Sequence, residues 1–207
     1  ARVSLRIVPD ATIRVLEAAH GSVDLIQNDF PPHFLRVLEK RKDLVIEQRP
    51  GRNLKYLVFN LAKPALADVR VRRALAMAID REAILRYKLA GLGRPATGVL
   101  SPEDPFYEPD VERYVFDPAA AESLLDDAGF PRGADGVRMH FDYKTSTDET
   151  AVGVAKVLKS QWAAVGVDVT IRPAEWGIFF HDVQSGYFEM YSLTLSAVVD
   201  PDLRAHD

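Results

Sequence analysis

The chain has 207 residues, a mass of 23.1 kDa, a formal net charge of −4 and a sequence pI near 5.8. This balance excludes the basic field typical of nucleic-acid and anionic-membrane binding. The absence of cysteine excludes disulfides, thiolate metal sites and cysteine nucleophiles. The hydrophobic fraction of 47% is ordinary for a globular protein, and the longest uncharged apolar stretch, residues 190–199, is shorter than a membrane span.

The first fifty residues predict strands that alternate with short helices. Val3, Leu5 and Ile7 alternate with polar residues, which is the period of a strand with one apolar face. Asp10 is placed to cap a helix that Gly21 ends. Further strands are predicted over 23–26 and 44–48, and a further helix from Pro31-Pro32 to about Lys40.

After Pro50-Gly51, which we interpret as a boundary between two units, residues 55–60 (KYLVFN) predict a strand. Asp68 is placed to cap a helix that begins at Val69 and runs through Ile79. Apolar residues recur there at i, i+3, i+4, i+7 and i+8, which predicts one buried face. The residues of this face are Val71, Ala74, Leu75, Ala78 and Ile79.

Arg70, Arg72 and Arg73 stand on the first turn of that helix, where they either grip an acidic partner or stabilise the fold. Positive charge at a helix start opposes the macrodipole, and the chain as a whole is acidic. We therefore interpret the arginines as structural. Their expected partners are the nearby carboxylates of Asp68, Asp80 and Glu82.

The rest of the chain continues the alternation of helices and strands. Residues 91–116 are rich in Pro and Gly and predict a long ordered loop. The alternation of strands and helices predicts an α/β fold with a mixed sheet, flanking helices and parallel strand pairs. Helices are predicted over 117–129, 149–164 and 176–186, and strands over 138–143, 167–173 and 189–199. Asp117 is the N-cap of the first of these helices. Val154, Leu158 and Trp162 form the apolar face of the second.

Catalytic and metal-binding signatures are missing from the sequence. The five histidines are scattered without metal-ligand spacing, and no nucleophile elbow, P-loop or dinucleotide-binding motif occurs. A hydrolytic enzyme on an α/β frame remains an alternative, but it would need a convergent triad or metal cluster. Trp162 is predicted to lie in the core. Trp176 stands at a strand-to-helix junction, where a side chain faces the groove at the strand ends, and is predicted to bind a ligand.

Several segments together resemble one family: KYLVFN, ADVRVRRALAMAIDREAIL, YVFDPAAAESLLDDAGF, LKSQWAAVGVDVTIRPAEWGIFF and the final DPD. Their order and spacing are similar to those of the extracytoplasmic solute-binding proteins of ABC importers, in the peptide, oligopeptide and nickel class (family 5). The resemblance extends over essentially the whole chain. No single segment is specific, but the combination is.

The resemblance implies a type II periplasmic-binding-protein-like lobe within a bilobed parent protein. Residues 1–48 would be the βαβ tail of the first lobe, 49–193 the second lobe, and 194–207 the strand that returns across the hinge. The parent would capture a peptide or another small solute between its lobes and deliver it to ABC permease subunits. It would be periplasmic or anchored on the outer side of the membrane, would not be an enzyme, and would need neither cofactor nor nucleic acid.

The resemblance also implies which residues contact the solute. Peptide-binding relatives hold the ligand's amine with an acidic residue three positions before the Asp of the DP pair, where this chain has Ala197. They hold the carboxylate with an arginine in the loop before the long helix, where this chain has lysine one residue away. Both departures argue against an ordinary free dipeptide, and leave a modified or longer peptide, a sugar oligomer or a small metabolite. The expected contacts are Trp176, Asn60, Tyr56, Lys144, Thr145, Ser146, Thr194, Ser196 and Asp200.

A second reading of the same resemblance is the ligand-sensing domain of a transcription regulator built on the binding-protein fold. The sequence upstream would separate the two, because an importer component carries a secretory or lipoprotein signal and a regulator carries a helix-turn-helix.

Overall fold

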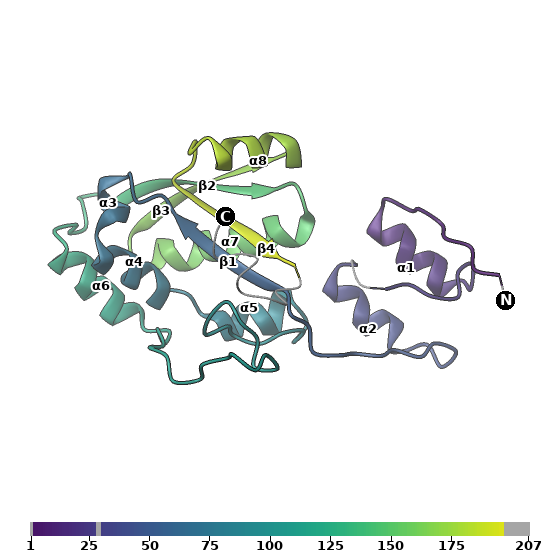
Figure 1. Cartoon of the computed structure of the whole chain (residues 1–207). Coiled ribbons are helices and arrows are strands. Elements are labelled where there is room, and N and C mark those ends of the chain that lie inside the picture. The colour runs from purple at the N-terminus through teal and green to yellow at the C-terminus, as the bar shows by residue number, and fades with distance from the viewer. Residues whose placement is uncertain (1, 28–29, 197–207) are drawn as a thin grey trace.

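The computed structural model describes residues 2–27 and 30–196, and its centre is a four-stranded mixed sheet (Figure 1). The strand order is β1-β4-β2-β3. β4 pairs antiparallel with β1 and parallel with β2, and β2 pairs parallel with β3, which confirms the predicted mixed sheet. The carboxyl ends of β2, β3 and β4 and the amino end of β1 therefore meet at one edge, named here the carboxyl edge. The strands are β1 (Leu54–Phe59), β2 (Met139–Ser146), β3 (Val167–Ala174) and β4 (Met190–Leu195).

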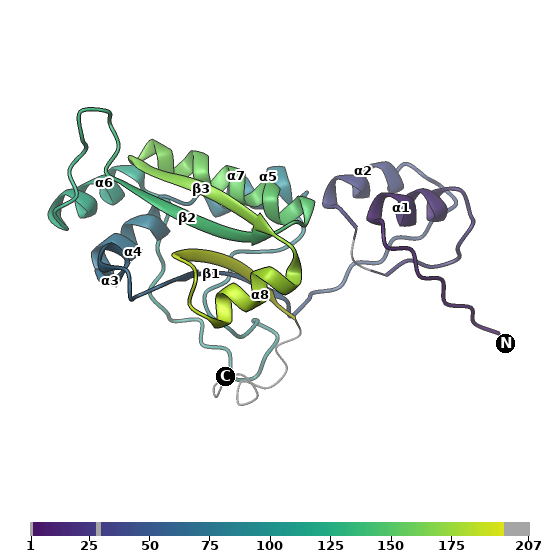
Figure 2. The ribbon, with the colours of Figure 1, turned by 90° about the horizontal axis from the view of Figure 1, so that it is seen from above.

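Helices cover both faces of the sheet, with α7 (Glu149–Ala164) on one face and α8 (Trp176–Gln184) on the other (Figure 2). Successive side chains of β2 alternate between these layers. Tyr143 is fully buried against Trp162 of α7, whereas Lys144 reaches Asp182 of α8. The α7 layer also contains α4 (Val69–Met77) and α6 (Pro118–Asp127), and the shorter helices near it are α3 (Pro64–Ala67) and α5 (Arg81–Lys88).

The core lies between the sheet and α7. Asp148 caps α7 by accepting a hydrogen bond from the backbone N–H of Ala151 (2.7 Å). Val154, Leu158 and Trp162 then follow at a spacing of four residues and are buried, as predicted. Trp162 is fully enclosed and contacts the edge of the Tyr143 ring, with ring centroids 6.1 Å apart. This burial contributes several kcal/mol, which makes Trp162 a principal anchor of the lobe.

The arginines of the first turn of α4 are structural, as predicted, but only one of the expected carboxylates is used. Asp68 caps the helix and pairs with Arg70 (2.7 Å). Arg72 donates to the carbonyl oxygen of Leu66 (2.8 Å), and Arg73 reaches the Tyr114 hydroxyl (3.2 Å). The prediction that Asp80 and Glu82 pair with these arginines is wrong, because both belong to α5, which the sequence analysis did not foresee.

In α5 the Asp80 carboxylate accepts from the backbone N–H of Ala83 (2.8 Å), and Glu82 lies in the first turn. The chain therefore begins a second helix directly after α4 ends, and Asp80 is used as its N-cap. All five apolar residues predicted for the buried face of α4 and its C-terminal extension are buried: Val71, Ala74, Leu75, Ala78 and Ile79.

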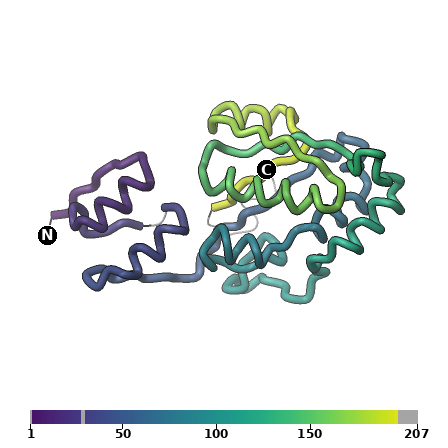
Figure 3. Tube along the Cα trace, turned by 180° about the vertical axis from the view of Figure 1, so that it is seen from behind, coloured from purple at the N-terminus to yellow at the C-terminus, as the bar shows by residue number. Residues whose placement is uncertain are grey.

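The first fifty residues lie beside the sheet and its helices (Figures 1 and 3). Asp10 caps α1 (Ala11–Ala19) as predicted, and η1 (Pro32–Phe34) continues into α2 (Leu35–Leu38). The strands predicted over 3–8, 23–26 and 44–48 are not formed. A strand needs a neighbour for its backbone groups, and the described residues supply none here. Val3, Leu5 and Ile7 are accordingly 83%, 92% and 93% exposed.

Residues 91–116 are irregular, as predicted, and side-chain bonds hold them in shape. The guanidinium of Arg94 pairs with the carboxylate of Glu103, and this contact lowers the pKa of Glu103 to about 2. The hydroxyl groups of Thr97 and Tyr107 share a hydrogen bond of 2.7 Å. The loop thus forms an ordered flank of the lobe.

Candidate functional site

The carboxyl edge gathers side chains from all four strands in one row. Tyr56 pairs with Leu193, and Ser146 pairs with Ala174. The parallel register of β2 and β4 matches Tyr143 with Met190, so three residues further on Ser146 is level with Leu193. The row therefore crosses the sheet from Tyr56 to Ala174, and its side chains lie on the face covered by α8.

The structure brings several of the predicted site residues to this edge, but on different faces. Tyr56 and Ser146 lie on the α8 face, and Trp176 begins α8 two residues after β3 ends. Thr145 lies on the α7 face, fully buried, and its hydroxyl has no hydrogen-bond partner in the described part of the chain. Thr194 shares that face, and exposed Ser196 follows β4.

Lys144 is engaged by a protein carboxylate. Its ammonium Nζ lies 2.5 Å from Oδ2 of Asp182 on α8, and both side chains are mostly buried. Partial burial strengthens such a charge-assisted bond. The cation predicted to contact the solute therefore fastens α8 to the sheet in this structure.

Asn60 does not join the other predicted residues, because it follows β1 at the opposite end of the strand. Its amide Nδ2 donates to the carbonyl oxygen of Phe188 (2.8 Å), and its Oδ1 accepts from the N–H of Ala62 (3.0 Å). Asn60 thus holds the turn before β4. Asp200 and Ala197 lie outside the described residues.

Aromatic side chains form the most prominent feature of the α8 face. The Trp176 ring stacks on Phe180, with centroids 5.6 Å apart and planes inclined by 20°. It also stacks on Phe179, which is fully buried and meets the edge of Tyr191 at 6.0 Å. Burial raises the pKa of Tyr191, and the neighbouring Tyr56 adds to this shift. Phe180 was not among the predicted site residues, although its i, i+4 spacing from Trp176 can be read from the sequence.

The α7 face of the same edge carries a lysine. Lys55 pairs with Thr194 in the register of β1 and β4. Lys55 is exposed at the surface, but partial desolvation by the protein atoms around it lowers its pKa, and the nearby carboxylate of Asp148 opposes that shift. This cation is therefore separated by the sheet from the aromatic residues of α8.

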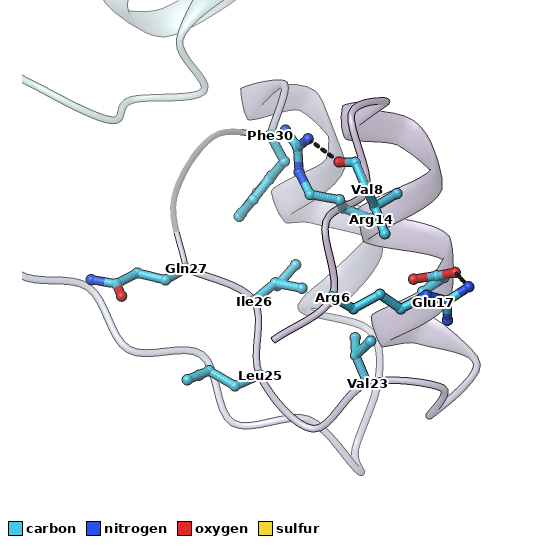
Figure 4. Close-up of a pocket in the computed structure, with 9 residues that line it drawn as sticks. All are labelled: Arg6, Val8, Arg14, Glu17, Val23, Leu25, Ile26, Gln27 and Phe30. Atoms are coloured by element: carbon cyan, nitrogen blue, oxygen red, sulfur yellow. Dashed lines mark hydrogen bonds and ion pairs between the residues drawn. The ribbon is translucent and has the colours of Figure 1, made fainter. Parts of the chain in front are cut away.

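Two hollows among the described residues lie away from the carboxyl edge. One, of about 180 Å³, lies in the N-terminal segment beside α1 and is lined mainly by apolar side chains, with an ion pair between Arg6 and Glu17 (2.9 Å) (Figure 4). The other lies between α2 and α5 and includes Arg36 and Arg86. Neither hollow contains a predicted site residue.

Within residues 2–27 and 30–196, no group of three or more His, Asp or Glu side chains converges as a metal site would require. In the same ranges, no helix has both the length and the apolar character needed to cross a lipid bilayer.

The model of the bacterial extracellular solute-binding proteins, family 5 Middle, matches residues 1–204. The chain belongs to this family. This finding confirms the resemblance drawn from the sequence. Among curated family 5 relatives, the dipeptide-binding protein of Escherichia coli K12 is 29% identical over 87% of this chain. Heme-binding protein A of Haemophilus influenzae is also 29% identical, over 89% of this chain. The chain spans about a third of the length of each, 34% in both cases.

Solved structures of family 5 proteins share the fold. The dipeptide-binding protein of Pseudoalteromonas sp. SM9913, in complex with Met-Leu, matches 95% of this chain and 39% of its own, with a TM-score of 0.81 and 27% identity. NikA of Brucella suis, in complex with Fe(III)-EDTA, matches 95% of this chain and 42% of its own, with a TM-score of 0.86 and 24% identity. The second comparison supports the fold alone.

Proposed function

We propose that this chain contributes one lobe to a two-lobed solute-binding protein. The protein captures a peptide or another small solute and delivers it to the permease subunits of an ABC importer. Family membership supports the proposal, because residues 1–204 match the family 5 model. In this proposal residues 49–193 form the second lobe, 1–48 belong to the first, and 194–207 return across the hinge.

The observation that carries the proposal is the composition of the carboxyl edge. Ligands of open α/β folds bind outside the carboxyl ends of strands. In this chain Tyr56 and Ser146 lie on the α8 face of this edge, and Trp176 begins α8 two residues after β3 ends, so the three come from segments that are distant in sequence. Aromatic and hydroxyl groups of this kind orient a small ligand in a cleft. Closure of a second lobe over this edge would remove the ligand from water.

The exposed apolar residues of the N-terminal segment support the division into lobes. Val3, Leu5 and Ile7 alternate with polar residues as strand residues do, yet they have no neighbouring strand in the described chain. In our proposal, strands of the first lobe cover them. The solute-binding protein acts outside the cytoplasm, either free or anchored at the membrane surface, where its permease partner is accessible.

A peptide is the first solute to test, because dipeptide-binding relatives and a neighbour with bound Met-Leu are similar to this chain. The full-length protein should be purified from the extracytoplasmic fraction of the cells that produce it. Native mass spectrometry should then show a bound solute, which is released and identified after denaturation. Calorimetry with that solute should give micromolar or tighter binding to the full-length protein. A full-length protein that carries no solute and binds no member of a peptide and oligosaccharide panel would contradict the proposal.

A further inference from the structure

The hollow between α2 and α5 has a volume of about 460 Å³ and lies where the N-terminal segment meets the rest of the chain (Figure 2). Three arginines from three separate stretches line it: Arg36 of α2, Arg86 of α5, and Arg94 in the loop that follows α5. The hollow therefore gathers positive charge on a chain whose formal net charge is −4. Such a local concentration of cations attracts anions.

The turn that ends α5 forms one wall of this hollow. Ala90 has φ +52°, a left-handed conformation that costs energy for a residue with a Cβ, and Gly91 follows with φ +79°. The backbone N–H of Gly91 donates to the carbonyl oxygen of Leu85 (2.8 Å), which closes the end of the helix. Because the chain reverses here, Arg94 and Pro95 line the same hollow as the side chains of α5.

Two of the three guanidinium groups have no carboxylate partner. Arg94 pairs through both of its terminal nitrogens with the carboxylate of Glu103. In the described part of the chain, no carboxylate forms an ion pair with Arg36 or Arg86. Glu82 also lines the hollow, one turn before Arg86 on α5, but does not pair with it. A guanidinium carries five N–H donors in a planar fork that matches the oxygens of a phosphate or carboxylate.

The remaining lining residues indicate what kind of anion fits. Leu85, Ala90 and Pro95 add apolar surface to the wall. The volume is far above the roughly 30 Å³ that one water occupies in the liquid, so the hollow can hold an organic group beside an oxyanion. The carboxylate of Glu82 repels any anion, and a single negative charge gains little against it. A group with two negative charges interacts favourably with both unpaired arginines.

We propose that this hollow binds a small phosphate monoester. Its phosphate accepts hydrogen bonds from Arg36 and Arg86, and its carbon body contacts Leu85 and Pro95. The hollow lies away from the carboxyl edge, so this molecule is an effector rather than the captured solute. Phosphate monoester groups occur both in free metabolites and in lipid headgroups, and this chemistry is common to the two sources.

The bound ester also joins two parts of the chain. Arg36 belongs to the N-terminal segment, whereas Arg86 belongs to the unit built on the sheet. One phosphate held by both arginines cancels their mutual repulsion and favours the arrangement of the two parts seen here. That these parts belong to different lobes rests on the proposed function. The binding site itself does not depend on it.

Binding can be measured by ¹H–¹⁵N correlation spectra of the 207-residue chain. The titrations are done at about pH 8, where a phosphate monoester carries nearly two charges, and chloride keeps the ionic strength constant. The probes are glycerol 3-phosphate, inorganic phosphate, acetate and glycerol. The backbone signals of Gly91 and Gly93 report on the wall of the hollow. The indole signal of Trp162, which is enclosed in the core, shows in each variant that the fold is intact.

Glycerol 3-phosphate should shift the signals of Gly91 and Gly93 with saturation, and inorganic phosphate should do so at higher concentration. Acetate, with one charge, should bind about tenfold more weakly than glycerol 3-phosphate, and glycerol should have no effect. The signal of Leu38 on α2 should follow the same saturation curve as that of Gly91, because one ligand contacts both sides. Different curves on the two sides would contradict the bridging role.

Variants locate the site. R36M and R86M should each weaken binding of glycerol 3-phosphate about tenfold, because each removes one fork. R172M is the matched control, since Arg172 is an exposed arginine that pairs with Asp142 and does not line the hollow, and it should leave binding unchanged. E82Q should strengthen binding about threefold, because it removes the opposing charge.

The same variants can overturn the proposal. If R36M and R86M weaken binding no more than R172M, the anion only screens surface charge and the hollow is not a site. If E82Q weakens binding, the hollow takes a zwitterion or a cation instead of a phosphate. Neither result affects the proposed function, because capture of a solute by the full-length protein is measured separately.

The source of the phosphate is tested with phosphatidylcholine vesicles that contain or lack phosphatidic acid. Sedimentation of the chain only with the phosphatidic acid vesicles, abolished by R36M and R86M but not by R172M, would assign the site to a lipid headgroup. Binding of glycerol 3-phosphate without sedimentation would assign it to a free ester. An absence of both would refute the proposal.

Discussion

The indole N–H of Trp162 donates a hydrogen bond to the backbone oxygen of Leu75, with 3.0 Å between Nε1 and O, across 87 positions of the chain. This bond joins α7 directly to α4 inside the core. Because both groups are buried, neither has water as an alternative partner. The bond therefore specifies how the two helices pack as well as stabilising them.

Replacing Trp162 should be far more costly than replacing the other tryptophan. W162F removes the hydrogen bond and leaves a cavity, so we expect a loss of about 2–4 kcal/mol in the free energy of unfolding. W176F changes an exposed ring and should alter that free energy by less than about 1 kcal/mol. Urea denaturation followed by circular dichroism measures both variants. Equal losses would show that Trp162 does not anchor the core.

Arg138 should be essential for the junction between α6, β2 and the turn that joins them. Its side chain is only 3% exposed and binds Glu122, Asp126 and the Phe130 carbonyl. R138M leaves these acceptors without their cation, and we expect a loss of about 3 kcal/mol. Arg172, which is exposed and pairs with Asp142, provides the control, and R172M should cost less than about 1 kcal/mol. A melting temperature that falls equally in both variants would contradict this role.

Gly166 should tolerate alanine less well than Gly129, although both have positive φ, +82° and +88°. A Cβ at Gly166 would lie 3.0 Å from Arg138 Cγ and 3.1 Å from the Gly136 carbonyl oxygen, whereas nothing lies within 4 Å at Gly129. G129A should cost about 1 kcal/mol for backbone strain, and G166A about 1–3 kcal/mol more. Chemical denaturation of the two variants gives the difference directly, and a difference near zero would show that the turn adapts freely.

Tyr143 should make the lobe less stable in strong alkali. Burial raises the pKa of Tyr143 to about 12 from a model-peptide value of 10.0, against a smaller opposing effect of the Ser192 hydroxyl. Between these values the unfolded chain loses the phenolic proton and the folded chain keeps it. Stability therefore falls as pH rises from 10 to 12, by about 2–3 kcal/mol in total.

Y143F should remove that part of the alkaline loss. The hydroxyl of Tyr143 is buried, and it makes no hydrogen bond of ordinary geometry in the described chain beyond a weak interaction with the Ser192 hydroxyl. At pH 7 the variant should therefore be as stable as the parent within about 1 kcal/mol. Unfolding free energies of both proteins at pH 8 and about pH 11 test the prediction. A difference between the two proteins that stays constant with pH would overturn it.

Local signals in the sequence were sufficient where a helix depends on its own residues. Asp10, Asp68 and Asp117 each cap the helix that was predicted to follow, and the apolar spacing of α7 correctly placed Trp162 in the core. Capping and periodicity act within one or two turns, so they can be recognised without the rest of the chain.

The prediction of strands at 3–8, 23–26 and 44–48 was wrong because a strand, unlike a helix, depends on residues outside its own segment. Alternation identifies a segment that suits a sheet, but the partner that completes the strand is not encoded in the segment. The same limit applies to the site. Lys144 and Asp182 are 38 positions apart, and only the packing of α8 on β2 shows that the lysine is engaged. Trp176 as a solute contact stays a prediction.

The extended segment at the start of the chain has a consequence for handling the protein. Unpaired backbone groups beside exposed Val3, Leu5 and Ile7 make this segment a template on which another copy can add a strand, so the isolated chain is expected to aggregate at high concentration. Arg2 and Arg6 occupy two of the alternate positions, with the uncharged Ser4 between them. The two arginines act as gatekeepers, because stacked copies would bring like charges into register, and replacing them should accelerate the association.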